Sequence, residues 1–120
     1  MAQNTPLSYR SLVIYEVFPR NHGPNGNFAD VESDLERIRA MGVDVLWLMP
    51  IHPIGAVARK GSLGSPYSIA DYRAVNPEYG TLDDFRHLID KAHRLGLKVM
   101  IDVAFNHTAH DSVLVREHPE

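Results

Sequence analysis

Residues 97–105 read Leu97-Lys98-Val99-Met100-Ile101-Asp102-Val103-Ala104-Phe105, an almost continuous apolar run with several β-branched side chains. Residues 12–18 and 43–49 have the same character, and a proline follows each of these two runs. Such runs, without strict alternation, are typical of strands covered on both faces in a parallel sheet. Short buried helices are the alternative interpretation, but each run is brief and rich in Val and Ile. The sequence therefore predicts three parallel strands.

Two amphipathic helices are predicted between these strands. The first extends from an N-cap at Asn27 to a stop at Gly42, and its apolar face is formed by Phe28, Val31, Leu35, Ile38 and Met41. The second begins with a capping box at Thr81 and Asp84 and stops at Gly96. Its apolar stripe consists of Phe85, Leu88, Ile89, Ala92 and Leu95. The order strand–helix–strand–long loop–helix–strand predicts right-handed α/β crossovers.

The composition limits the functional classes. The chain has 120 residues, no cysteine and a net charge of −3, which excludes a disulfide framework and a thiolate zinc site. Positive and negative residues are mixed, so we expect no nucleic-acid partner. No apolar run reaches the ~18 residues of a membrane helix, so we expect no membrane partner. The N-terminus has no signal-peptide core, which favours a cytoplasmic location.

Polar residues follow the predicted strands. Arg20, Asn21 and His22 come after the first strand, His52 comes after the second, and Asp102, Asn106 and His107 come at the end of the third. Reactive groups gather at the carboxyl ends of strands in parallel α/β folds. Residues 51–80 are rich in Pro, Gly and Ser, whereas ordinary connections have ~2–6 residues, so this segment is either functional or disordered.

Several of these residue types leave two interpretations open. Asp102 lies in an apolar run, so its carboxylate is either a satisfied structural group or part of a polar pocket. His107, His110 and His118 lack the H-E-x-x-H spacing of a zinc site, and Asn106 offers one amide oxygen to calcium, which takes ~6–8 oxygens.

Three tyrosines of the long loop, Tyr67, Tyr72 and Tyr79, could stack on a sugar ring or pin the loop. For Tyr72 and Tyr79 the pinning interpretation is preferred.

Three segments resemble the α-amylase family of glycoside hydrolases. Asp102-Val103-Ala104-Phe105-Asn106-His107-Thr108 closely resembles its first signature region, D-x-x-x-N-H. Tyr67-Ser68-Ile69-Ala70-Asp71-Tyr72, with residues 75–77 and 79–81, resembles the loop before the second barrel helix. Residues 14–20 with 26–28 resemble the first strand and turn. The three segments occur in the family's order and cover most of residues 12–108.

This resemblance implies an α/β fold, the N-terminal portion (strands 1–3 and helices 1–2) of a (β/α)₈ TIM barrel. Residues 1–120 would then be a partial catalytic barrel domain. Residues 51–80 would be a long βα loop that lines a sugar pocket, and residues 109–120 would be the start of an inserted second domain.

The resemblance also implies a function. The chain would be a fragment of an α-glucan-active glycoside hydrolase with a retaining mechanism, acting on starch or maltooligosaccharides. The family's nucleophile and acid/base come from later strands, so we expect no catalytic residue in this chain and no activity from it alone, although its full-length parent would be an enzyme. A non-catalytic sugar-binding or structural module from a truncated barrel is the alternative. A flavodoxin-like binding domain is a third interpretation, but the chain has no phosphate-cradling loop.

Four site residues are implied by matching positions. Tyr67 would stack under the glucosyl ring at the point of cleavage, and His107 would bind its hydroxymethyl oxygen. Asp102 would lie at the pocket floor in a supporting position. Asn106 would be a calcium ligand in those members that bind calcium, and no other cofactor is implied.

We therefore expect Tyr67 and His107 to converge on one rim. The loop of residues 22–27 departs from a second family calcium site. Open strand edges and uncovered apolar surface lead us to expect self-association of the isolated chain.

Overall fold

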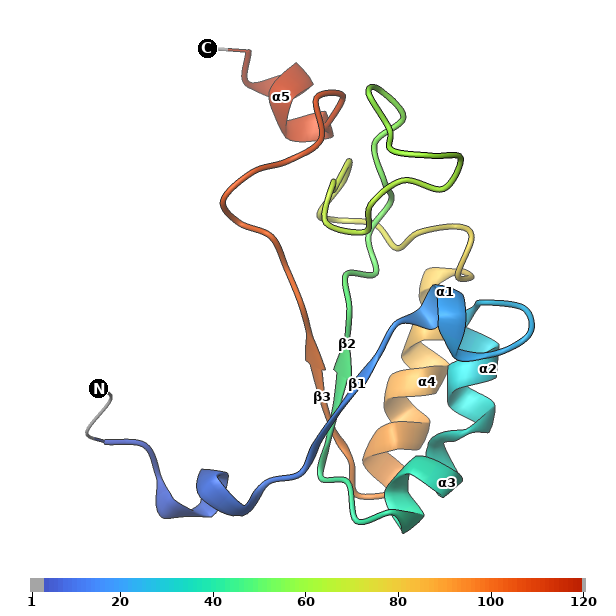
Figure 1. Cartoon of the computed structure of the whole chain (residues 1–120), viewed down its shortest axis with the longest axis vertical. Coiled ribbons are helices and arrows are strands. Elements are labelled where there is room, and N and C mark those ends of the chain that lie inside the picture. Colours follow the sequence, from blue (N-terminus) through green and yellow to red (C-terminus); the bar gives the residue numbers. More distant parts are fainter. Residues whose placement is uncertain (1–3, 120) are drawn as a thin grey trace.

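The computed structural model describes residues 4–119, so residues 1–3 and 120 of the predicted domain lie outside the described part. Its centre is a parallel sheet of three strands in the order β1-β2-β3, with β1 at Ile14–Val17, β2 at Val45–Leu48 and β3 at Lys98–Ile101 (Figure 1). The helices are η1 (Leu7–Ser11, 3₁₀), α1 (Pro19–His22), α2 (Phe28–Ser33), α3 (Leu35–Ala40), α4 (Leu82–Arg94) and α5 (Val113–Glu117). Each predicted apolar run contains one strand, which confirms the α/β class and the parallel arrangement.

The strand β3 is shorter than its apolar run. It ends at Ile101, although the Asp102 amide still donates to the Leu48 carbonyl at 2.8 Å. Beyond this point the chain leaves the sheet and runs toward the loop of residues 51–80 (Figure 1). The expectation of a strand through residue 105 was therefore wrong, and further along the chain the amides of Ala109 and Val113 donate to the carbonyls of Ile69 and Ala70 in that loop instead of to a neighbouring strand.

Helices cover one face of the sheet. The helices α2, α3 and α4 lie together on the same side of the strands (Figure 1), where Val17, Leu46 and Leu48 are fully buried. On the opposite face Ile14 and Met100 are 51% and 41% exposed. The expectation of strands covered on both faces was wrong for β1 and β3, because they are the two edge strands and have exposed side chains on that second face, whereas the central strand β2 has no exposed residue.

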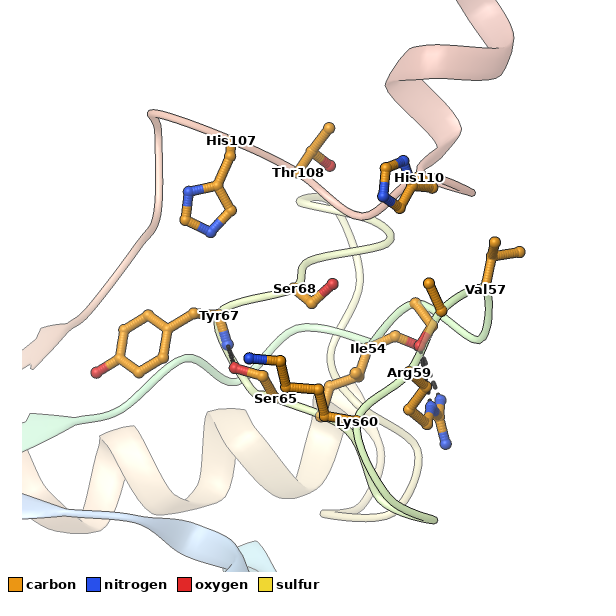
Figure 2. A pocket seen from close by; sticks show the side chains of 12 residues that line it. Ile54, Val57, Arg59, Lys60, Ser65, Tyr67, Ser68, His107, Thr108 and His110 are labelled. Carbon is orange, nitrogen blue, oxygen red and sulfur yellow. Dashed lines mark hydrogen bonds between the residues drawn. The ribbon is translucent and has the colours of Figure 1, made fainter.

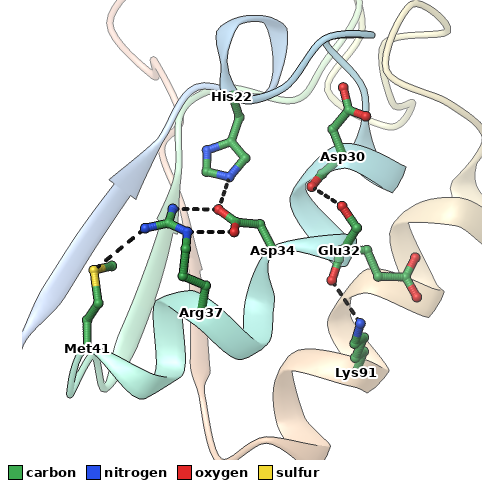
Figure 3. Close-up of polar contacts among 8 residues, drawn as sticks. His22, Asp30, Glu32, Asp34, Arg37, Met41 and Lys91 are labelled. Atoms are coloured by element: carbon green, nitrogen blue, oxygen red, sulfur yellow. Dashed lines mark hydrogen bonds and ion pairs between the residues drawn. The ribbon is translucent and has the colours of Figure 1, made fainter.

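The predicted helix of residues 28–41 is two helices that meet at Asp34. Asn27 caps α2 by accepting from the Asp30 amide at 3.0 Å, and Gly42 has the left-handed φ of +89°, as predicted. At this break the Asp34 carboxylate pairs with His22 at 2.8 Å and with Arg37 at 2.6 Å (Figure 3). This contact holds the break against α1.

The helix α4 follows its sequence signals closely. The Thr81 hydroxyl accepts from the Asp84 amide at 3.1 Å, while the Asp84 carboxylate accepts from the Thr81 amide at 2.7 Å. Leu88 and Ala92 are fully buried, and Gly96 has a φ of +82° just after the helix. The predicted capping box and stop are confirmed.

Helices α2 and α3 are also joined to α4 by polar contacts. Lys91 donates to the Glu32 carbonyl at 3.0 Å (Figure 3) and pairs with Glu36 at 3.0 Å. Arg39 donates to the carbonyl oxygens of Leu95 and Val43 at 3.1 and 2.6 Å. These contacts hold the helical layer together. The long loops gather at the carboxyl end of the sheet. Within residues 4–119 no helix has the length and apolarity required to cross a membrane.

Candidate active site

The loop of residues 51–80 is an ordered arm above the carboxyl ends of the strands (Figure 1). Ile54 and Ile69 form an antiparallel bridge, and the Gly55 amide donates to the Ser68 carbonyl at 2.9 Å. Tyr79 at the end of the arm is 1% exposed, and its carbonyl accepts from the Phe28 amide at 2.8 Å. These contacts give the segment a defined conformation, which favours the functional interpretation over disorder.

Arg59 holds the tip of the arm together. Its guanidinium donates to the carbonyl oxygens of Gly55, Ile54 and Ser62 at 2.9, 3.1 and 3.1 Å. Gly64 packs against this side chain with a φ of +72°, and a Cβ there would lie 2.8 Å from Arg59 Cγ. The arm tip is therefore shaped around this guanidinium, which uses three of its five N–H donors within the arm.

The segment after β3 lies along this arm. The Thr108 hydroxyl and the Ala109 amide both donate to the Ile69 carbonyl, at 2.7 and 3.0 Å. Asp111 extends the contact, because its Oδ2 accepts from the amides of Ala56 and Val57 at 2.9 and 3.4 Å. These backbone contacts lower the pKa of Asp111 below its ordinary value. The arm and the post-β3 segment thus form two joined walls.

A cavity of about 300 Å³ lies between the two walls (Figure 2). Tyr67, Ser65 and Ser68 line it from the arm, and His107, Thr108 and His110 line it from the post-β3 segment. Tyr67 and His107 therefore converge on one cavity, as the sequence led us to expect. That either of them binds a sugar stays a prediction.

Asp102 lies behind Tyr67 rather than on the cavity wall. The Tyr67 hydroxyl donates to Asp102 Oδ2 at 2.8 Å. This hydrogen bond, with a smaller contribution from burial, raises the pKa of Tyr67 to about 12. The half-buried carboxylate of Asp102 is thus paired with a side chain that itself lines the cavity, which supports the structural interpretation. A place for Asp102 in a sugar pocket stays a prediction.

The sequence was compared with known proteins. The profile described as "Alpha amylase, catalytic domain" matches residues 11–120, and thus includes both walls of the cavity. This chain belongs to the α-amylase family. An α-amylase from Lactobacillus plantarum has a similar structure, with 62% identity and a TM-score of 0.91 over 92% of this chain. A maltogenic α-amylase from Thermotoga neapolitana has 46% identity and a TM-score of 0.86 over 90% of the chain.

An α-1,4-glucan:maltose-1-phosphate maltosyltransferase from Rhodospirillum rubrum is 46% identical over 88% of this chain. The chain spans 18% of the length of this transferase and 26% of each of the two amylase chains. The fold is the N-terminal portion of the family's (β/α)₈ barrel, with α2 and α3 together as its first helix and α4 as its second. The inserted second domain at residues 109–120 stays a prediction, since this part of the chain contains only the short helix α5.

The described residues do not contain a set of ligands for calcium, which some members of the α-amylase family bind. Asn106 is exposed and lines a second, mostly apolar cavity of about 440 Å³ with Phe105 and Tyr72. Residues 4–119 contain no group of three or more His, Asp or Glu side chains arranged for a metal. A single amide oxygen does not supply the ~6–8 oxygens that calcium takes. We therefore assign no functional step to calcium.

The other strand-end residues have structural partners. Arg20 donates to the carbonyls of Leu63 and Gly64 at 3.0 Å each, and His52 Nδ1 lies 2.9 Å from the Ala74 carbonyl. The Tyr72 hydroxyl donates to the carbonyls of Ala104 and His107 at 2.6 and 3.0 Å. These contacts, like those of Tyr79, support the loop-pinning interpretation. Asn21 is exposed, and His22 belongs to the Asp34 contact.

The sequence reasoning missed Lys60 on the cavity wall and Asp111 behind it. A lysine within a Gly- and Ser-rich loop was the only available signal for Lys60. Asp111 had none, because its partners are backbone amides more than fifty residues away in the chain.

Proposed function

We propose that the cavity between the two walls binds the glucosyl unit of an α-glucan or maltooligosaccharide at the point of cleavage. The supporting observation is that the Tyr67 ring and the His107 imidazole line the same cavity (Figure 2). An aromatic face and a nitrogen donor are complementary to the two sides of a pyranose ring, which is apolar on its faces and hydroxylated at its edge.

Tyr67 serves as the stacking platform in this proposal. The hydrogen bond from its hydroxyl to Asp102 fixes the direction of the ring, so the aromatic face is held ready before the sugar arrives. A flat, electron-rich ring also stabilises the positive charge that develops on the sugar in an oxocarbenium-like transition state. Asp102 acts as a positioning residue through this contact.

His107 supplies the edge contact. Its side chain is exposed on the opposite wall, and we assign it to the hydroxymethyl oxygen of the same sugar. A hydrogen bond of this kind contributes about 0.5–1.5 kcal/mol to binding.

In the retaining mechanism, two carboxyl groups ~5–5.5 Å apart perform nucleophilic attack and acid/base catalysis. The cavity wall, as far as residues 4–119 form it, contains neither Asp nor Glu. We therefore propose that this chain supplies the binding half of the site in a full-length α-amylase-type glycosidase and has no turnover by itself. Water or a second sugar would accept the glucosyl group, since both amylases and a maltosyltransferase are among the similar proteins.

A binding measurement on the 120-residue chain tests the proposal. Maltotriose should shift the backbone amide signals of Tyr67 and His107 in ¹H–¹⁵N NMR spectra, and Tyr67→Ala should weaken binding at least tenfold. Tyr9→Ala is the matched control, because Tyr9 is a 60% exposed tyrosine in η1 and lies outside the cavity. Binding that is equal in the Tyr67→Ala and Tyr9→Ala variants would refute the assignment. Release of glucose or maltose from starch by the pure chain would refute its inactivity.

Sugar binding without catalysis is the second candidate function. It is favoured by the same carboxylate-free wall among the described residues. The reading frame downstream of Glu120 separates the two candidates. Further β/α units that carry an Asp and a Glu at strand ends would support the enzyme, and their absence would support a sugar-binding module.

A further inference from the structure

The turn before α2 contains an Asn-Gly pair, Asn25-Gly26, and the asparagine is exposed. An asparagine that precedes glycine is chemically reactive, because the following backbone nitrogen can reach the side-chain amide without hindrance from a Cβ. Asn25 is the only asparagine of the chain that a glycine follows. The turn thus has the sequence of a deamidation site, and it lies outside the cavity assigned to the sugar.

The fold requires glycine at position 26. Gly26 has a φ of +62°, and a Cβ there would lie 2.4 Å from the carbonyl oxygen of Arg20. Any other residue would be strained by the left-handed backbone and would collide with this oxygen. A bulkier residue at position 26 therefore cannot protect the asparagine, so protection has to come from the contacts of the turn.

Asp30 contacts both groups that take part in the reaction. Its Oδ2 accepts from the Gly26 amide at 2.9 Å, and its Oδ1 accepts from the Asn25 side-chain nitrogen at 3.0 Å. Oδ2 also accepts from the Asn25 amide at 2.7 Å. The attacking nitrogen and the leaving nitrogen are thus held by one carboxylate, which belongs to the first turn of α2.

The Asp30 carboxylate is itself held in place. A Cβ at Gly23 would lie 2.5 Å from the Cβ of Asp30, so the two residues pack closely, and the Asp30 amide donates to the Asn27 side chain at 3.0 Å. The hydrogen bond from the Asn25 side chain outweighs desolvation and, with backbone hydrogen bonds of the turn, lowers the pKa of Asp30 below its ordinary value. At neutral pH the group that holds the turn is therefore an anion.

We propose that Asn25 is a site of spontaneous deamidation, and that the Asp30 carboxylate protects it while the turn is closed. In the reaction, the Gly26 nitrogen loses its proton to water and forms a bond to Cγ of Asn25. The bond from Cγ to Nδ2 breaks, and this nitrogen takes up a proton and leaves as ammonia. Water then opens the succinimide ring to give aspartate or isoaspartate. No electrons are exchanged, and water is the only co-reactant.

The Asp30 carboxylate opposes each of these steps. Loss of the Gly26 proton is disfavoured because the resulting anion would face a second negative charge. The ring closes only after the two nitrogens leave their hydrogen bonds with Asp30, so the reaction proceeds through local opening of the turn. Afterwards a carboxylate at position 25 faces that of Asp30, and their repulsion keeps the turn open. Deamidation thus makes a transient opening permanent.

The test measures the rate of conversion of Asn25 in the 120-residue chain at pH 8. Mass spectrometry of proteolytic peptides separates asparagine, aspartate and isoaspartate at this position. The folded wild type should react at least tenfold more slowly than the same chain unfolded in urea, and Asp30→Ala should react at least fivefold faster than the folded wild type. Glu32→Ala is the matched control, because it removes a carboxylate from the same helix and leaves the hydrogen bonds of the turn in place.

Two further variants separate a local effect from a general loss of folding. Asp30→Asn keeps an acceptor oxygen and the size of the side chain, so it should stay folded by circular dichroism and react at a rate between those of the wild type and Asp30→Ala. Thr81→Ala weakens the fold at the cap of α4 and should leave the rate at Asn25 unchanged.

Three results would overturn the inference. Equal rates in the folded wild type and the unfolded chain would show that the turn gives no protection. A slower reaction in either Asp30 variant than in the wild type would show that the carboxylate promotes the attack as a base. A Thr81→Ala variant that reacts as fast as the Asp30 variants would assign the protection to global stability. None of these results affects the proposed sugar site, whose cavity does not include this turn.

Discussion

The hydroxyl of Tyr67 donates a 2.8 Å hydrogen bond to Oδ2 of Asp102, which joins the arm of residues 51–80 to the end of β3. The donor lies on the cavity wall and the acceptor follows the last residue of the strand. The sheet thus sets the position of the ring that we assign to the sugar, even though that ring belongs to a long loop. Loop residues with a binding role commonly depend on such a rigid support.

This relationship predicts the titration of Tyr67. The hydrogen bond to Asp102 raises the pKa of Tyr67 to about 12, so its signal should stay unchanged through pH 10–11 in ¹³Cζ-tyrosine NMR spectra. In Asp102→Ala the pKa should return toward the ordinary tyrosine value of about 10. A Tyr67 that titrates alike in both proteins would contradict the contact.

The same shift has a consequence for stability at high pH. Because the folded pKa of Tyr67 lies above the unfolded value, the native state favours the neutral phenol. Its contribution to stability should be complete below about pH 10 and lost as the pH rises toward about 12. Asp102→Ala should lack this contribution, which alkaline unfolding curves of the two proteins would reveal.

The Asp34 carboxylate should make the stability depend on pH in the opposite direction, in acid. Its hydrogen bonds with Arg37, and then with His22, lower the pKa of Asp34 to about 2. The contribution of this carboxylate should therefore be present above about pH 4 and lost as the pH falls through about 2. The Asp34 side chain is 25% exposed, so we expect Asn at this position to cost only about 1 kcal/mol at neutral pH.

Urea unfolding between pH 2 and 5 measures this effect. The difference in free energy of unfolding between the wild type and Asp34→Asn should be constant above about pH 4 and shrink toward zero near pH 2. Asp90→Asn on the exposed face of α4 is the control. A pH-independent difference for Asp34→Asn would show that its carboxylate is not held by these partners.

The sequence predicted the fold wherever the signals were local. The three apolar runs, the Asn27 cap and the Thr81 capping box depend on residues a few positions apart, and all are present in the structure. The division of the helix at Asp34 was not predictable in this way, and the Asp34 carboxylate there contacts His22 from a different element. The uncovered second face of β1 and β3 also escaped the pattern, since apolar residues look the same whether or not a partner covers them.

The residues of the candidate site also divide into those that have a local sequence signal and those that depend on distant contacts. Tyr67 and His107 lie in segments that resemble those of the α-amylase family, and this resemblance led us to expect both on the one rim where the structure has them. Lys60 and Asp111 act through a turn around Arg59 and through backbone amides distant in the chain. Contacts between side chains and remote backbone leave no periodic or compositional trace, which is why these two residues were missed.

The capping box of α4 predicts a measurable loss of stability. In Thr81→Ala the Asp84 amide loses its side-chain acceptor, and the free energy of unfolding should fall by about 1 kcal/mol. Thr81→Ser keeps the hydroxyl and should retain most of the stability. Urea unfolding of the three proteins at pH 7 checks the prediction, and a serine variant as unstable as the alanine variant would contradict it.

Removing the Asp111 side chain should open the arm locally. Its Oδ2 accepts from the amides of Ala56 and Val57, so Asp111→Ala should speed hydrogen exchange at these two amides at least tenfold. Asp71→Ala is the control, because Asp71 accepts only from the Arg73 amide within its own turn. Equal exchange rates at Ala56 in both variants would show that the two walls are held together without Asp111.

The uncovered face of the sheet predicts self-association. Ile14 and Met100 are 51% and 41% exposed on this face, and β1 and β3 are the two edges of the sheet with unpaired backbone groups. Sedimentation velocity at increasing protein concentration should therefore show a growing fraction of dimer or larger species.

Met100→Lys should shift the population toward monomer, because a charge buried between two such faces costs several kcal/mol. Met41→Lys is the control, since Met41 is also exposed, at 51%, but lies at the end of α3, on the helical side. A single monomeric boundary over a hundredfold range of concentration, or an equal response to both substitutions, would contradict association through the sheet.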